Sequence, residues 1–133
     1  MSPDKLISLA LEARKNAYAP YSGYTVGAAL ECTDGTVYTG CNVENASYSI
    51  TCCAERTAIF KAVSEGKRKF TSIAVVGAMA EENAPLSQYG SPCGVCRQAL
   101  AEFGLDIRVY GAKSPEDYIV HTISDLLPGA FVL

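Results

Sequence analysis

The chain has 133 residues, of which 49% are hydrophobic and 19% are charged, a balance typical of a folded globular protein and not of a disordered or fibrous one. Eleven basic and fourteen acidic residues give a net charge of -3, and no basic run exceeds residues 67–69, which argues against a nucleic-acid partner. The length predicts a single domain over residues 1–133, and the lack of a leader-like or membrane-spanning apolar run indicates a cytoplasmic protein without a membrane partner.

Helical and extended segments alternate along the chain, and turn residues separate them. Asp34-Gly35 supplies the tight turn of a β-hairpin, and the apolar, β-branched run 71–77 is typical of a strand buried on both faces. Ser91 and Pro92 suit the cap and first position of a helix. The predicted elements, in order, are a helix from Ser2 that ends before Pro20, strands at 24–32 and 37–41, a helix over 53–65, a strand over 71–77, a helix from Ser91 through Phe103, strands at 107–110 and 118–122, and a helical turn through Leu127.

This order of elements predicts an α/β fold with three layers, α/β/α, around a mixed five-stranded sheet. Two right-handed crossovers in the middle of the chain would bring the amino ends of the second and third helices to one edge of that sheet. Because ligands of open α/β sheets bind at the carboxyl ends of strands, we expect the chemistry at this edge.

Cysteines mark the amino ends of both of these helices. Cys93 and Cys96 lie three residues apart, so their sulfurs can share one tetrahedral metal ion, although small buried core residues would show the same pattern. A third thiolate from the second helix would leave one zinc position open for water, as a catalytic site requires. Either neighbour can supply it: Cys52 shares a helix face with Glu55, whereas Cys53 begins a Cys-Ala-Glu signature. We favour Cys53, because Cys-Ala-Glu followed by Pro-Cys-Gly-Val-Cys is the pattern of zinc deaminases.

Two charged residues follow the cysteine on the second helix. Deamination requires a carrier that moves a proton from the attacking water to the ring nitrogen and then to the leaving amine, and Glu55 is the candidate for this catalytic role. Three thiolates leave zinc with a formal charge of about -1. We therefore expect Arg56 to offset part of this charge by donating hydrogen bonds to the ligand sulfurs. Taken singly, both residues would be ordinary solvated helix charges.

With these residues in place, the chain resembles cytidine deaminase, the small homotetrameric type, from near residue 4 to Phe131. The resemblance implies one Zn²⁺ per subunit and hydrolysis of cytidine and 2'-deoxycytidine to uridine and 2'-deoxyuridine with release of ammonia, a step of pyrimidine salvage. The segments that carry it are residues 18–22, 26–30, 40–46, 53–58, 91–98 and 126–128, together with Phe131.

The resemblance also implies a set of residues that bind the nucleoside substrate. Asn42 and Glu44 would hydrogen-bond the ribose, and Tyr24 stands where the family commonly has a phenylalanine near the substrate. The backbone N–H of Ala54 and the carbonyl of Ser91 would read the edge of the base. Neighbouring subunits of a homotetramer would contribute the remaining residues, which are Ala46, Tyr48 and Phe131.

Several features lie outside the two ligand motifs. Residues 80–90 form a loop that is longer than in compact bacterial relatives, and it includes Tyr89. His121, Cys32 and Cys41 are expected to be structural, because each falls on a predicted strand. The alternative functions are deamination of a modified cytosine nucleoside such as blasticidin, editing of a nucleic acid, which the acidic balance opposes, and a noncatalytic protein with a closed structural zinc site.

Overall fold

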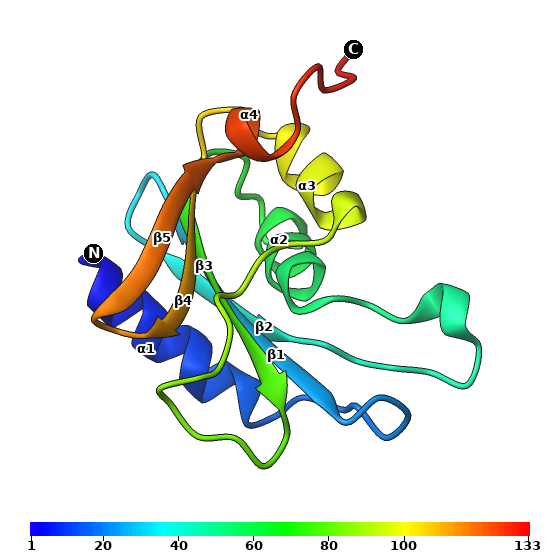
Figure 1. Ribbon diagram of the computed structural model, residues 1–133. Coiled ribbons are helices and arrows are strands. Elements are labelled where there is room, and N and C mark those ends of the chain that lie inside the picture. Colours follow the sequence, from blue (N-terminus) through cyan, green and yellow to red (C-terminus); the bar gives the residue numbers. More distant parts are fainter.

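A mixed five-stranded sheet forms the centre of the computed structural model, which describes residues 1–133 (Figure 1). The strands lie in the order β2-β1-β3-β4-β5, and every neighbouring pair is antiparallel except β3 and β4. The predicted mixed sheet is therefore confirmed. The elements are α1 (Pro3–Arg14), β1 (Tyr24–Cys32), β2 (Val37–Cys41), the 3-10 turn η1 (Tyr48–Ile50), α2 (Ala54–Ser64), β3 (Phe70–Met79), α3 (Gly94–Ala101), β4 (Arg108–Ser114), β5 (Asp117–Thr122) and α4 (Ile123–Leu126).

Helices cover both faces of the sheet, because successive side chains of each strand point to opposite sides. On β1, Ala29 packs with Leu6 and Ile7 of α1, whereas Leu30 faces the opposite way and packs with Ile59 of α2. Figure 1 shows α1 on one side of the sheet and the pair α2 and α3 on the other. The two apolar clusters give the three predicted layers.

The directions of the strands bring the amino ends of α2 and α3 together. Since β1 is antiparallel to both β2 and β3, and β4 is parallel to β3, the strands β2, β3 and β4 all run the same way. Each of the two helices follows one of these strands and returns over the same face. Their amino ends therefore lie at one sheet edge, as the predicted crossovers require.

A close contact at Gly40 seats α2 on the sheet. A Cβ atom added to Gly40 of β2 would lie 2.5 Å from the carbonyl oxygen of Ala54 and 2.6 Å from the amide nitrogen of Ala58. The first turn of α2 thus rests directly on the strand backbone, where only glycine leaves enough room. This contact places Cys53, the residue before α2, at the carboxyl end of β2.

The predicted start of the third helix is wrong. The third helix begins at Gly94, and its N-cap is the extended residue Cys93, not Ser91. The Ser91 hydroxyl and the Pro92 carbonyl are instead bound by the side chain of Arg97. The first helix ends at Arg14, before Pro20 as predicted, and the amides of residues 15–17 bond three residues back in a tighter final turn. No helix is both long and apolar enough to cross a membrane.

Candidate active site

Three cysteine thiols meet at the amino ends of α2 and α3. The sulfurs of Cys53, Cys93 and Cys96 all lie within 4.8 Å of one another, and the first two are 3.7 Å apart. Tetrahedral zinc with bonds of about 2.3 Å needs sulfurs about 3.8 Å apart, so these donors fit one zinc ion. Cys52 lies outside the cluster, and its sulfur accepts a hydrogen bond from Thr57 Oγ1 at 3.6 Å.

The electrostatics of the cluster favour a cation among the sulfurs. A hydrogen bond from Cys96, helped by Arg56, lowers the pKa of the Cys53 thiol to about 5. The same hydrogen bond, together with burial, raises the pKa of Cys96 far above its usual range. Neighbouring sulfur anions would repel one another, and a divalent cation among them would offset that repulsion. Both helix amino ends, which carry partial positive charge, begin at cluster residues and lack side-chain caps.

Glu55 is a buried carboxyl group next to the thiols. Its side chain lies on the first turn of α2, is only 3% exposed, and leaves Oε1 without a hydrogen-bond partner. Burial raises the pKa of Glu55 to about 7. A buried acceptor without a partner beside a metal site is suited to exchanging a proton with a bound molecule near neutral pH.

Arg56 makes the contact that the sequence predicts. Its Nη2 donates to Cys53 Sγ at 3.4 Å and to the Thr51 carbonyl at the same distance. The hydrogen bond to Cys53 raises the pKa of the guanidinium, which therefore stays charged beside the sulfur. Its positive charge offsets part of the negative charge of the cluster.

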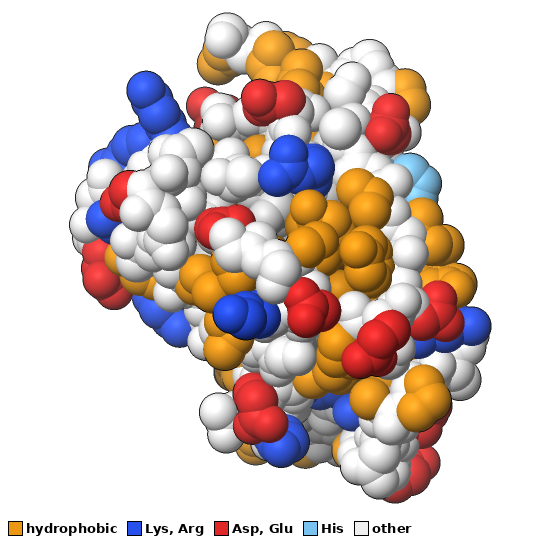
Figure 2. Space-filling model, turned by 90° about the vertical axis from the view of Figure 1, so that its left-hand side faces the viewer, with side chains coloured by type: hydrophobic (Ala, Val, Ile, Leu, Met, Phe, Trp, Pro, Cys, Tyr) orange, Lys and Arg blue, Asp and Glu red, His pale blue; other side chains and the backbone are white.

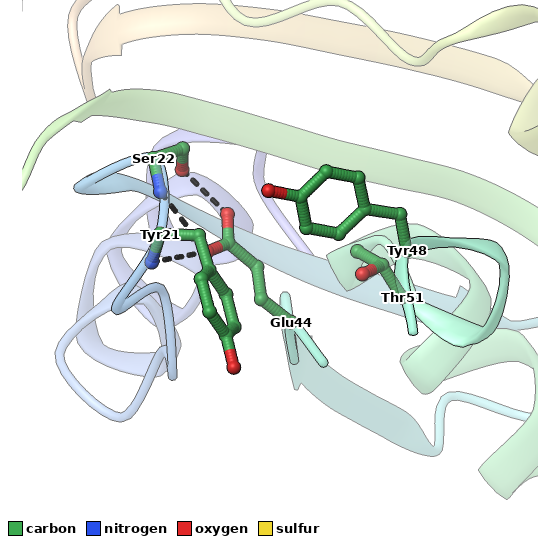
Figure 3. Close-up of a pocket in the computed structure, with 5 residues that line it drawn as sticks. All are labelled: Tyr21, Ser22, Glu44, Tyr48 and Thr51. Atoms are coloured by element: carbon green, nitrogen blue, oxygen red, sulfur yellow. Dashed lines mark hydrogen bonds between the residues drawn. The ribbon is translucent and has the colours of Figure 1, made fainter. Parts of the chain in front are cut away.

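A second group of residues lines an open hollow of about 390 Å³ (Figure 3). Glu44 is held there by the amides of Tyr21 and Ser22 at 2.9 and 3.1 Å, and by the Ser22 hydroxyl. The hydrogen bond from Ser22 lowers the pKa of Glu44, so the carboxylate is ionised. The ring of Tyr48 and the side chain of Thr51 complete the lining, and Thr51 precedes Cys53 by two residues.

Asn42 and Tyr24 lie where β1 begins and β2 ends. The amide of Asn42 is largely engaged, since Oδ1 accepts from Val26 N at 2.8 Å and Nδ2 donates to the Tyr24 carbonyl at 2.9 Å. The ring of Tyr24 lies over β3, where a Cβ added to Gly77 would be 3.0 Å from it. Asn42 thus fixes the backbone around Tyr24, and one amide hydrogen is left for a ligand.

Only some of the other predicted substrate residues lie at the hollow or beside the thiols. Ala54 is the first residue of α2, where its N–H has no acceptor within the helix, and the Ser91 carbonyl accepts no hydrogen bond from the chain. Tyr48 lines the hollow of its own chain although 76% exposed. Ala46 and Phe131 are exposed and belong neither to this hollow nor to the cluster.

The residues expected to be structural are not part of the thiol cluster. Cys32 is 2% exposed in the core, Cys41 ends β2, and His121 lies on β5.

The loop of residues 80–90 is fastened to the β4–β5 hairpin, because Tyr89 Oη donates to Asp117 at 2.7 Å and Lys113 Nζ lies 4.5 Å from the Tyr89 ring centre.

Some contacts of the site were not predicted. Tyr21 and Ser22 belong to the matching segment 18–22, yet no role was assigned to them, and the same holds for Arg97 in the segment 91–98. The spacing of Ser22 and Glu44 gives no sign of their contact, because a hairpin lies between them. A hydroxyl residue inside a matching segment is the only signal that could have drawn attention to Ser22.

Comparison with known proteins agrees with this geometry. The family model for the cytidine and deoxycytidylate deaminase zinc-binding region matches residues 1–112. Cytidine deaminases of Sporosarcina psychrophila and Halalkalibacterium halodurans are 51% and 50% identical to the chain, covering 98% of it and 92% and 95% of their own lengths. The crystal structure of cytidine deaminase from Burkholderia pseudomallei superimposes with a TM-score of 0.86 at 48% identity, covering 98% of this chain and 100% of that one.

Similarity to a blasticidin deaminase is lower. A blasticidin-S deaminase of Bacillus cereus is 32% identical over 77% of the chain and 74% of its own length. The family model describes a zinc-binding region, and the three thiols that fit one zinc ion lie within the residues that it matches. The chain belongs to the cytidine deaminase family of zinc-binding hydrolytic deaminases.

Proposed function

We propose that the chain converts cytidine and 2'-deoxycytidine to uridine and 2'-deoxyuridine with release of ammonia, as a step of pyrimidine salvage. The observation that carries this proposal is the buried Glu55, whose Oε1 has no partner, beside three thiols that fit one zinc ion. Zinc held by Cys53, Cys93 and Cys96 would supply an activated water at neutral pH. A cytoplasmic location would suit the site, because the thiols must stay reduced to hold the metal.

In this mechanism Glu55 carries protons in both directions. As water adds to C4 of the base, Glu55 accepts its proton and delivers it to ring atom N3. In the second stage Glu55 takes the proton of the new hydroxyl group and passes it to the exocyclic amine. The C4–N bond then breaks, ammonia leaves and the C4 carbonyl forms. The pKa of about 7 suits a group that must accept and return protons near neutral pH.

The substrate would be held at two places. Glu44, ionised and fixed by Ser22, would accept hydrogen bonds from ribose hydroxyls, with the remaining N–H of Asn42 beside it. The N–H of Ala54 and the carbonyl of Ser91 would pair with the base, and the ring of Tyr24 would pack near it. This sugar-binding group favours a nucleoside over a free base.

We further propose that the chain acts as a homotetramer whose subunits share active sites. Support comes from apolar side chains that nothing covers in a single chain: Phe131 is 70% exposed, and Ile119 and Val120 of β5 are 42% and 47% exposed. Figure 2 shows hydrophobic side chains gathered on the side of the molecule that carries β5. Ala46, Tyr48 and Phe131 would then reach substrate sites of neighbouring subunits.

An assay of the purified, reduced, zinc-loaded protein tests the function. We expect cytidine and 2'-deoxycytidine to yield uracil nucleosides and equimolar ammonia, and a chelator to abolish the activity until zinc is restored. We expect blasticidin S to be a poorer substrate than cytidine. Zinc-loaded protein that leaves cytidine unchanged, or that prefers blasticidin S, would overturn the proposal.

A further inference from the structure

Arg97 makes three hydrogen bonds beside the thiol cluster, and none of them is part of an ion pair. The residue lies on α3 directly after Cys96, and it is half-buried. Its Nε donates to the Pro92 carbonyl at 2.7 Å, Nη1 to the Leu126 carbonyl at 2.8 Å and Nη2 to Ser91 Oγ at 3.0 Å. All three acceptors are neutral, so the rigid guanidinium fork acts here by its geometry.

The contacts of Arg97 fix the turn that leads into the metal site. They hold the side chain of Ser91 and the carbonyl of Pro92, whose ring is fully buried. The Ser91 carbonyl, which lies between these two anchored groups, is the one that accepts no hydrogen bond from the chain. Because backbone carbonyls are strong acceptors, a fixed but unused one is available to a ligand.

The same part of α3 also holds the end of the chain. Arg97 binds the last residue of α4, and the neighbouring Gln98 donates from Nε2 to the Phe131 carbonyl at 2.8 Å. The turn with Ser91 and the C-terminal segment are therefore fastened to one short stretch of helix. A shift of the Arg97 side chain would break the link that it makes between this turn, α3 and α4.

We propose that Arg97 is a positioning residue that holds the Ser91 carbonyl against the exocyclic amine of the cytosine base. The inference rests on the proposed function, in which this carbonyl reads the base edge. An amine can donate to a carbonyl, whereas the C4 oxygen of uridine is itself an acceptor and cannot. The fixed carbonyl thus favours substrate over product, and Arg97 acts through it without touching either.

The variant Arg97→Met keeps an unbranched apolar stem in place of the arginine stem and removes all three hydrogen bonds. We expect its kcat/KM for cytidine to fall by about 10 to 100-fold, since a small displacement of a positioning group can cost about 100-fold. Inhibition by uridine should change by less than about threefold, because uridine does not use the carbonyl. Zinc content should stay at one per subunit. Arg97→Lys, whose ammonium group can make some but not all of these hydrogen bonds, should recover part of the lost kcat/KM.

Two further variants make the test specific. Arg68→Met is the matched control, because Arg68 also donates to two backbone carbonyls, those of Val63 and Lys67, but far from the thiols, and it should match the wild type. Ser91→Ala removes one acceptor of Arg97 while it keeps the carbonyl, so it should lower kcat/KM in the same direction. Combined with Arg97→Met it should add less than about twofold, since both changes remove the same contact.

Three results would overturn the inference. The first is an Arg97→Met enzyme that is as active on cytidine as the wild type. The second is an Arg97→Met enzyme whose uridine binding or zinc content falls as much as its kcat/KM for cytidine. The third is a Ser91→Ala enzyme with an unchanged kcat/KM. The last result decides the matter even if Arg97→Met does not fold. An inactive wild type would instead refute the proposed function, and the inference with it.

Discussion

A glutamate on the first turn of a helix is ordinarily exposed and ionised, and the position of Glu55 changes both properties. The side chain is 3% exposed, so its charged form loses contact with water and its pKa rises to about 7. Arg56, the next residue, donates to Cys53 on the same turn. Adjacent residues of one helical turn thus supply the proposed proton carrier and a charge that steadies the thiolate.

Replacing Glu55 by glutamine separates proton transfer from metal binding. Glu55→Gln keeps the shape of the side chain and leaves all three thiols in place, so we expect one zinc per subunit. Turnover of cytidine should fall at least about 100-fold, because general acid–base catalysis contributes about 10² to 10⁴-fold. Zinc analysis and a cytidine assay measure the two effects.

Glu65→Gln is the matched control, since Glu65 follows the same helix and accepts only from the hydroxyl of Tyr38. It should keep full activity. A Glu55→Gln enzyme that is as active as this control would remove Glu55 from the mechanism.

At the scale of elements, the site depends on how α2 and α3 start. The strands and the order of elements were predictable from apolar periodicity, and Cys93 and Cys96 from their spacing, because these are local patterns. Cys53 was preferred over Cys52 only through the Cys-Ala-Glu signature. The start of α3 was not, since Ser91 and Pro92 look like a cap and a first turn in sequence alone. What decides their conformation is Arg97, and one of its acceptors, Leu126, lies 29 residues further along the chain.

The contact of Gly40 with α2 makes a prediction at this scale. In Gly40→Ala the new methyl group would press on the carbonyl of Ala54, so α2 must move outwards. We expect the free energy of unfolding to fall by about 1–3 kcal/mol, as is usual for overpacking, and the affinity for zinc to fall with it. Denaturant unfolding and zinc titration measure both.

Gly94→Ala provides the comparison, because a Cβ at Gly94 meets nothing within 4 Å and its backbone is ordinary helix. This variant should be at least as stable as the wild type. Equal effects of the two substitutions would show that the close approach at Gly40 is unimportant.

Across the whole molecule, the metal joins parts of the chain that are far apart in sequence. Cys53 and Cys93 are 40 residues apart, and all of β3 and the following loop lies between them. A ligand that binds only the folded state stabilises it by mass action, by about 2.7 kcal/mol when its concentration is 100 times its Kd.

We therefore expect a chelator to lower the Tm by several degrees and to leave the protein less resistant to denaturant. Readdition of zinc should restore the Tm, whereas magnesium should not, because it prefers oxygen ligands. Thermal unfolding followed by circular dichroism, with and without chelator, measures the change. An unaltered Tm after complete removal of zinc would show that the folded state does not depend on the metal.

Glu44 lies on a segment that leaves the body of the molecule after β2 and returns through η1 to α2 (Figure 1), whereas the thiols lie on helix ends packed against the sheet. In the proposed function, the reaction and the recognition of the sugar would therefore belong to separate parts of the structure. Mutation of the projecting segment would then change which pentose is accepted and leave the three thiols and Glu55 in place. Related enzymes could therefore differ in substrate preference and still use the same catalytic residues.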